Sequence, residues 1–174
     1  MDIVRIGPKV VDRRKIDLVL DRILEERQRG ASQDEVARKL KLDRTFISRL
    51  EKLGEVRRGK RIAIVGFPVA NRDELEEVAR QEGVEFTLLL TDHERWEYVQ
   101  KKSGLELFND IMRLIADARQ CDVVILLGSD RRVQLLQGLV DRDVVSVELG
   151  PSPLRGDVWF PPERLRNLIR QVKD

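Results

Sequence analysis

Hydroxyl and cationic side chains share one arc of a helix predicted for residues 44–53. At about 100° per residue, this arc carries two arginines, two hydroxyl groups and a lysine: Arg44, Thr45, Ser48, Arg49 and Lys52. Arginine can bind guanine O6 and N7 in a bidentate manner, serine and threonine can bind base edges or phosphates, and lysine neutralises backbone charge. The pattern therefore predicts a helix that lies in the major groove of DNA.

The opposite arc of this helix is apolar, which predicts that it is buried. Over roughly 120° it carries four large side chains: Phe46, Ile47, Leu50 and Leu53. A preceding helix, capped by Asp12 and ended by Gly30, offers a matching apolar face: Ile16, Val19, Leu20, Ile23 and Leu24. We expect the two apolar faces to pack into one small core.

A further short helix is predicted between these two. Ser32 is followed three residues later by Glu35, which is the pattern of a capping box. Its buried face would consist of three apolar residues: Val36, Ala37 and Leu40. Lys41 then begins a turn, and Asp43 can cap the next helix. An ordinary helical hairpin with a charged exterior is the alternative interpretation.

Residues 32–51 resemble the helix-turn-helix of phage-repressor-like (Xre-type) transcriptional regulators. The matching positions are a glutamine that opens one helix, a buried alanine and a β-branched residue in the next helix: Gln33, Ala37 and Ile47. The resemblance implies that Gln33 contacts a phosphate and that the polar arc reaches base edges: Arg44, Thr45 and Ser48, with Arg49 beside them. The sequence departs from the family at Lys41, where glycine is usual, and at Gly54, after which a strand replaces further helices. We therefore expect a three-helix unit.

Basic charge is concentrated in the amino-terminal part of the chain. Residues 1–60 contain 17 Lys and Arg against 11 Asp and Glu, whereas residues 61–174 contain 16 against 20. This asymmetry indicates that one part meets a polyanion, although a solvated charged surface is the alternative. Residues 55–61 are predicted to be a basic linker, and a hairpin around Gly59-Lys60 is the other interpretation. Four further basic residues are expected to contact phosphates together with Lys52: Lys41, Arg57, Arg58 and Lys60.

Residues 62–174 are predicted to form an α/β domain. Apolar strand-like runs alternate with amphipathic helical runs, including a long helical region at residues 92–119 that is interrupted at Ser103-Gly104. Such alternation indicates a doubly wound, mainly parallel Rossmann-like or flavodoxin-like sheet. A last helix from Pro162 would bury four side chains: Leu165, Leu168, Ile169 and Val172. We also expect Trp96, Tyr98 and Phe108 to pack, although stacking on a cofactor is the alternative. Trp159 and Phe160 are expected to lie under the last helix, and the alternative is that they line a pocket or a dimer surface.

Ligands of such sheets bind beyond the carboxyl ends of the strands. The loops expected there contain nine candidate ligand-binding residues: Gly66, Phe67, Thr91, Asp92, Gly128, Ser129, Asp130, Gly150 and Ser152. Glycine and serine at these positions permit close approach of the backbone and expose the amides at helix starts to an anion. Tight turns between strands and helices explain the same residues without a ligand.

Several enzyme classes lack their motifs in this sequence. No GxGxxG follows the first strand, and no GxxxxGK[ST] or GxSxG occurs. His93 and Cys121 lack the companions of a zinc site, and Cys121 is expected to be a small packing residue. We therefore expect no enzymatic activity, cofactor or metal.

The single cysteine, the lack of an apolar signal core and the lack of a membrane-length apolar run favour a cytoplasmic protein with no membrane partner. The sequence as a whole predicts a DNA-binding regulator with a helix-turn-helix domain at residues 1–54. It would act as a homodimer on double-stranded DNA, joined through the α/β domains and the helices of residues 92–119, and a small-molecule effector is a further expectation. Two alternatives are an α/β ligand-binding protein or enzyme with a helical interaction module, and an adaptor without an effector.

Overall fold

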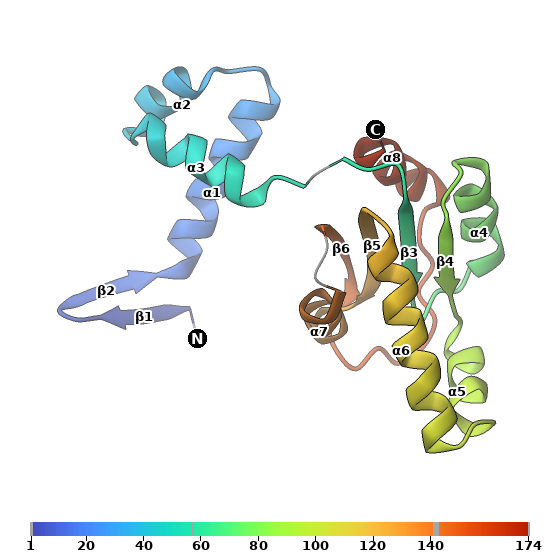
Figure 1. Cartoon of the computed structure of the whole chain (residues 1–174). Coiled ribbons are helices and arrows are strands. Elements are labelled where there is room, and N and C mark those ends of the chain that lie inside the picture. The colour runs from blue at the N-terminus through green and yellow to red at the C-terminus, as the bar shows by residue number, and fades with distance from the viewer. Residues whose placement is uncertain (1, 57, 141–142, 174) are drawn as a thin grey trace. The chain divides into compact units, whose positions relative to one another are not determined.

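The computed structural model describes residues 2–56, 58–140 and 143–173 of the 174-residue chain (Figure 1). The chain divides into two compact units, Met1–Glu55 and Val56–Asp174. Within the described ranges, no helix is both long enough and apolar enough to cross a membrane.

The first unit begins with a β-hairpin that the sequence analysis did not anticipate. β1 (Ile3–Ile6) pairs antiparallel with β2 (Lys9–Asp12), and Gly7 adopts a φ of 58° in the turn between them. The β-branched residues on both sides of Gly7-Pro8 are the local signal for this hairpin. β1 is exposed along its whole length, so burial does not explain its formation.

Three helices follow the hairpin: α1 (Arg13–Gln28), α2 (Gln33–Leu40) and α3 (Arg44–Gly54). The carboxylates of Asp12 and Asp43 each accept a hydrogen bond from the backbone N–H two residues further on. Ser32 and Glu35 form the reciprocal bonds of a capping box at the start of α2. The three predicted helix starts are therefore confirmed.

The core of the first unit is small. Its fully buried members come from all three helices: Ile23, Val36, Ala37 and Ile47. The prediction that Phe46 and Leu53 are buried is wrong, because they are 45% and 86% exposed. On α3 the buried arc is instead displaced toward Glu51, which is half-buried. Among the described residues of this unit, no further helix follows α3 to cover Phe46 and Leu53.

The predicted apolar face of α1 is also mostly exposed. Ile23 is buried, but Ile16, Val19 and Leu24 remain at the surface. α1 has 16 residues whereas α2 has only eight, so the shorter helix covers only part of its length. The prediction of a continuous buried face on α1 is therefore wrong outside the region of Ile23.

The second unit is a mixed α/β unit built on a four-stranded parallel sheet. Its strands are β3 (Ile62–Gly66), β4 (Phe86–Leu89), β5 (Val123–Ser129) and β6 (Asp143–Gly150). They lie in the order β4-β3-β5-β6, and every neighbouring pair is parallel. All seven residues of β5 are buried, as expected for a central strand that is covered on both faces.

Helices cover both faces of this sheet (Figure 1). The covering helices are α4 (Arg72–Gln81), α6 (Gly104–Gln120), α7 (Asp130–Val140) and α8 (Pro162–Val172). α5 (Asp92–Gln100) lies beyond the end of β4 and has no buried residue. Side chains of α4 and α8 pack in one core cluster, whereas side chains of α6 and α7 pack in a second cluster on the other face. The interruption at Ser103-Gly104 is confirmed, because Ser103 caps α6.

Two predictions of aromatic packing are corrected by the structure. Phe160 is buried as expected, but Trp159 is 58% exposed, because neighbouring residues of an extended segment point to opposite sides. Trp96 and Phe108 are also exposed, so the prediction that they pack is wrong. Tyr98 is half-buried and donates a hydrogen bond from its hydroxyl to Asp110 at 2.8 Å. The exposed aromatic residues of the second unit, within its described part, thus lie on α5, on α6 and before α8.

The segment before β3 is fixed to the second unit. The backbone N–H of Gly59 donates to the carbonyl of Val172 at 3.0 Å, and Asp122 accepts the N–H groups of Lys60 and Arg61. A Cβ atom on Gly59 would lie 2.2 Å from the Cβ of Asp122, so only glycine fits. Since β3 pairs with β4 and β5 on its two sides, a hairpin around Gly59-Lys60 does not form in this structure.

Candidate functional site

The turn between α2 and α3 has an unusual backbone conformation at its first residue. Lys41 adopts φ 55° and ψ 44°, and it is the one non-glycine residue with positive φ among the described residues. The N–H of Leu42 donates to the carbonyl of Ala37 at 2.9 Å, which satisfies an end group of α2. Asp43 then caps α3 with a 2.6 Å hydrogen bond to the N–H of Thr45. This sequence of contacts fixes the angle at which α3 leaves the turn.

The predicted base-contacting side chains lie together on the exposed face of α3. The set is Arg44, Thr45, Ser48 and Arg49, and each is exposed. Ile47 between them is fully buried, so the helix is held by one side and presents the other. The Nε atom of Arg44 lies 3.7 Å from Asp34 in a pair whose side chains are both about two-thirds exposed, and such a pair contributes little stability. The guanidinium group therefore remains accessible.

A network that the sequence analysis missed joins all three helices. Glu51 on α3 accepts hydrogen bonds from Arg27 on α1 at 2.5 Å and from Gln33 on α2 at 2.7 Å. Arg27 also donates to the carbonyl of Ala31. The hydrogen bond from Arg27 is the main reason that the pKa of Glu51 is lowered. The packing of the three helices brings these side chains together, so their spacing in the sequence could not predict the network.

This network bears on the predicted phosphate contact of Gln33. One N–H of its side-chain amide is directed at Glu51. An amide group carries two N–H donors, so the second is left for another acceptor. The bond to Glu51 would orient that second donor at the start of α2.

The other predicted phosphate-contacting residues are distributed over both units. Lys41 and Lys52 are exposed in the first unit, beside and on α3. Arg58 and Lys60 are exposed in the second unit. Arg57 lies outside the described residues.

The predicted ligand-binding loops of the second unit lie at the carboxyl edge of the sheet. Gly66 and Gly128 belong to the neighbouring strands β3 and β5, and the N–H of Phe67 donates to the carbonyl of Leu127 at 3.1 Å. A Cβ atom on Gly66 would lie 2.8 Å from Leu89, so the close packing of the strands explains this glycine. Gly66 therefore has a structural role that needs no ligand.

A second group of these residues meets at the ends of β5 and β6. The hydroxyl groups of Ser129 and Ser152 lie 3.5 Å apart, and Asp130 accepts the backbone N–H of Ser152 at 2.8 Å. Ser129 is fully buried. Gly150 adopts a φ of 151°, next to an irregularity in the pairing of the two strands. These contacts bring the predicted residues of two separate loops together.

The remaining predicted residues, Thr91 and Asp92, begin α5. Thr91 forms a capping box with Glu94, which lowers the pKa of Glu94 through the backbone N–H of Thr91. Asp92 accepts a hydrogen bond from Arg95 at 2.6 Å, and its own N–H donates to Asp157. Asp92 therefore already has protein partners on both its backbone and its side chain.

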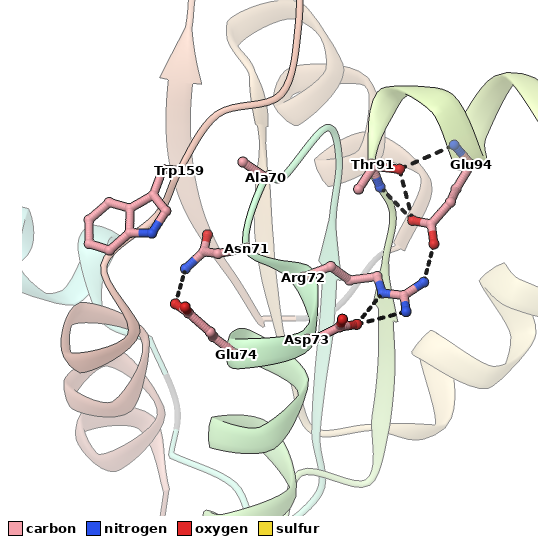
Figure 2. A pocket seen from close by; sticks show the side chains of 8 residues that line it. All are labelled: Ala70, Asn71, Arg72, Asp73, Glu74, Thr91, Glu94 and Trp159. Carbon is pink, nitrogen blue, oxygen red and sulfur yellow. Dashed lines mark hydrogen bonds and ion pairs between the residues drawn. The ribbon is translucent and has the colours of Figure 1, made fainter.

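Figure 2 shows a pocket of about 380 Å³ at the same edge of the sheet, and of its lining residues only Thr91 was a predicted ligand-binding residue. It is lined by residues after β3, after β4 and before α8: Ala70, Asn71, Arg72, Asp73, Glu74, Thr91, Glu94 and Trp159. Arg72 pairs with Asp73 and Glu94, and the hydrogen bond that Arg72 donates to Asp73 is the largest cause that raises the pKa of Arg72. Asn71 donates to Glu74 at 3.0 Å and to the carbonyl of Phe160 at 2.9 Å. The polar groups that line the pocket are thus largely paired with one another.

No known protein family model, curated protein or solved structure matches the chain. The function must therefore be inferred from the chemistry and placement of its own residues.

Proposed function

We propose that the chain is a sequence-specific DNA-binding transcriptional regulator in which α2 and α3 act as a helix-turn-helix. The observation that supports this most strongly is the two-sided nature of α3. Ile47 anchors the helix in the core, while Arg44 and Ser48 are exposed on the other side. A short helix of this kind fits the major groove and offers donors to base edges.

The contacts that hold α3 against the other two helices also support this function. Asp43 caps its first turn, and Glu51 ties it to α1 and α2 through Arg27 and Gln33. Base recognition depends on donors that are held in one geometry, because each bidentate contact needs both hydrogen bonds at once. Lys41 and Lys52 would neutralise phosphates on either side of the recognition surface.

A homodimer is the proposed functional state, since one short helix makes few contacts and such units bind paired half-sites. The support for self-association comes from α6. This helix exposes apolar side chains at spacings of three and four residues: Leu105, Phe108, Ile111 and Met112. An exposed apolar row of this length is typical of a surface that another protein covers. The proposed interface thus lies within residues 92–119.

We propose that the second unit is a Rossmann-like or flavodoxin-like body that senses a small-molecule effector in the cytoplasm. Counted within this unit, its strands lie in the order second, first, third, fourth, which equals the start of the flavodoxin-like order. A ligand at the carboxyl edge would act by changing the spacing between two DNA-binding units. The pocket in Figure 2 is the observation that supports the alternative, which is a ligand-binding protein or enzyme with a helical interaction module.

The test compares Arg44→Ala, Lys52→Ala and a matched control, Arg22→Ala, in the full-length protein. Arg22 is an exposed arginine of α1, so the control loses the same charge away from α3. Arg44→Ala should weaken specific binding by about 1–3 kcal/mol and relax the preference at one base pair. Lys52→Ala should weaken binding to all sequences and flatten its salt dependence.

Gel-shift competition with specific and unrelated duplexes at several salt concentrations measures both effects. An unchanged sequence preference in Arg44→Ala would show that α3 is not the recognition helix. Ligand binding or turnover by a full-length protein that shows no salt-dependent DNA binding would instead support the alternative function.

A further inference from the structure

The helices that follow the adjacent strands β3 and β5 pack on opposite faces of the sheet. The segment after β3 leads to α4, which packs on one face, whereas the segment after β5 leads to α7 on the other face. Such divergence at adjacent strands creates a topological switch point, where open α/β sheets bind their ligands. Phe67 stands directly after β3 at this point, and Arg132 lies in the first turn of α7.

Arg132 reaches across the switch point without an acceptor for one of its donors. Its guanidinium group lies 5.4 Å from the centre of the Phe67 ring. The Nη1 atom is buried and has no hydrogen-bond partner among residues 2–56, 58–140 and 143–173. Burial is the main cause that lowers the pKa of Arg132, and the positive charge of Arg95 lowers it further. The side chain is therefore held in a site that does not by itself favour a cation.

Arg95 of α5 brings a second guanidinium group to the same cluster. It pairs with Asp92 at 2.6 Å and lies 4.8 Å from the centre of the Trp96 ring. Its Nε atom is also buried and lacks a hydrogen-bond partner within the described part of the chain. The charge of Asp92 raises the pKa of Arg132, and Asp92 also pairs with Arg95, so the two guanidinium groups share this acidic partner.

Two unpaired buried donors of like charge are costly to a protein. Buried N–H groups almost always have a partner, and removing charged groups from water requires compensation. An anion with several oxygens can accept hydrogen bonds from two guanidinium groups at once, and it would neutralise their positive charge. Guanidinium groups bind such oxyanions especially well, because their N–H donors lie in one plane.

We infer that the switch point binds the phosphate or carboxylate group of a small molecule through Arg95 and Arg132. This site lies wholly within the second unit, and its test needs no DNA. Its failure would therefore leave the DNA-binding proposal standing, and the reverse also holds. The inference specifies the chemistry of the proposed effector and adds two residues that were absent from the predicted loops.

The experiment uses fluorescence of Trp96, since this ring contacts Arg95. The chain contains two tryptophans, so the full-length Trp159→Phe variant has Trp96 as its only one. Inorganic phosphate, pyrophosphate and citrate are titrated at constant ionic strength. Saturable binding of the phosphates or of citrate is expected, and their order identifies which oxyanion the site prefers.

Arg132→Gln and Arg95→Gln, made in the same background, should each weaken this binding by at least about tenfold. The matched control is Arg131→Gln, because Arg131 is the exposed neighbour of Arg132 on α7. Arg132→Lys serves if a glutamine variant does not fold, since it keeps the charge but loses the planar donors. No saturable binding of any probe, or equal binding by Arg132→Gln and the control, would overturn the inference.

Discussion

Replacing Lys41 with glycine should raise the stability of the first unit and lower its affinity for DNA. Lys41 has φ 55° and ψ 44°, a left-handed conformation that costs an L-residue roughly 1–2 kcal/mol. Glycine removes this cost but loses about 0.5–1 kcal/mol through the entropy of the unfolded chain. The net gain in the free energy of unfolding therefore lies between about 0 and 1.5 kcal/mol, with a midpoint of ~0.75 kcal/mol. The opposite effect on DNA arises because one phosphate-neutralising charge is lost.

Two spectroscopic signals separate the units in one urea titration. Both tryptophans, Trp96 and Trp159, lie in the second unit, so their fluorescence follows the unfolding of that unit alone. Far-ultraviolet circular dichroism follows the helices of both units. The part of the dichroism change without a fluorescence counterpart reports on α1, α2 and α3, and its midpoint should rise in Lys41→Gly.

Two control variants isolate the causes. Lys41→Ala loses the charge but keeps the left-handed residue, so its stability should stay close to that of the natural protein. Lys52→Gly also loses a charge but places glycine within α3, which should cost about 0.5–1 kcal/mol. All three variants should flatten the salt dependence of DNA binding by about 0.9 in the logarithmic slope. A stability of Lys41→Gly equal to or below that of Lys41→Ala would show that the left-handed conformation of residue 41 does not destabilise the first unit.

Other predictions concern the helix network and the proposed dimer. Glu51→Ala removes the acceptor of Arg27 and Gln33, and should destabilise the first unit by roughly 1.5 kcal/mol. This value is at the lower end for hydrogen bonds to charged groups, because the side chains of Arg27 and Glu51 remain 31% and 29% exposed. Because the pKa of Glu51 is lowered by folding, this contribution is complete at neutral pH and is lost progressively as the pH falls through the lowered folded-state pKa. Urea titrations should therefore show a larger difference between variant and natural protein at pH 7 than at pH 3.5. Phe108→Ser on α6 should weaken self-association by about tenfold to a hundredfold in sedimentation equilibrium. Asn109→Ser, a change at the exposed neighbouring residue, should leave self-association unchanged, and equal dimerisation of both variants would exclude this face.

The sequence was sufficient to predict those parts of the fold that depend on local chemistry. Ser32 and Glu35 identified the start of α2, and the apolar runs identified strands such as β5. Burial was harder to predict, because an apolar arc shows which side can be buried and not which side is covered. Phe46 and Leu53 illustrate this, since the first unit has too few helices to cover them.

The candidate sites follow the same division. Arg44 and Ser48 could be assigned to one face from helical periodicity alone. The contact of Glu51 with Arg27 could not be assigned, because 24 residues separate them and only the packing of α1 against α3 brings them together. Arg132 was not predicted for a similar reason. Its place at the switch point depends on which face of the sheet α7 packs against, and the sequence does not show this.

Selection of bound sequences from a pool of random duplexes tests whether α3 recognises base pairs. The natural protein and Arg44→Ala are compared under the same salt conditions. If α3 is the recognition helix, the natural protein enriches one motif, with half-sites about one helical turn apart, and Arg44→Ala loses the preference at a single base pair of each half-site. Enrichment of no motif by the natural protein, or of an identical motif by both proteins, would contradict this role of α3.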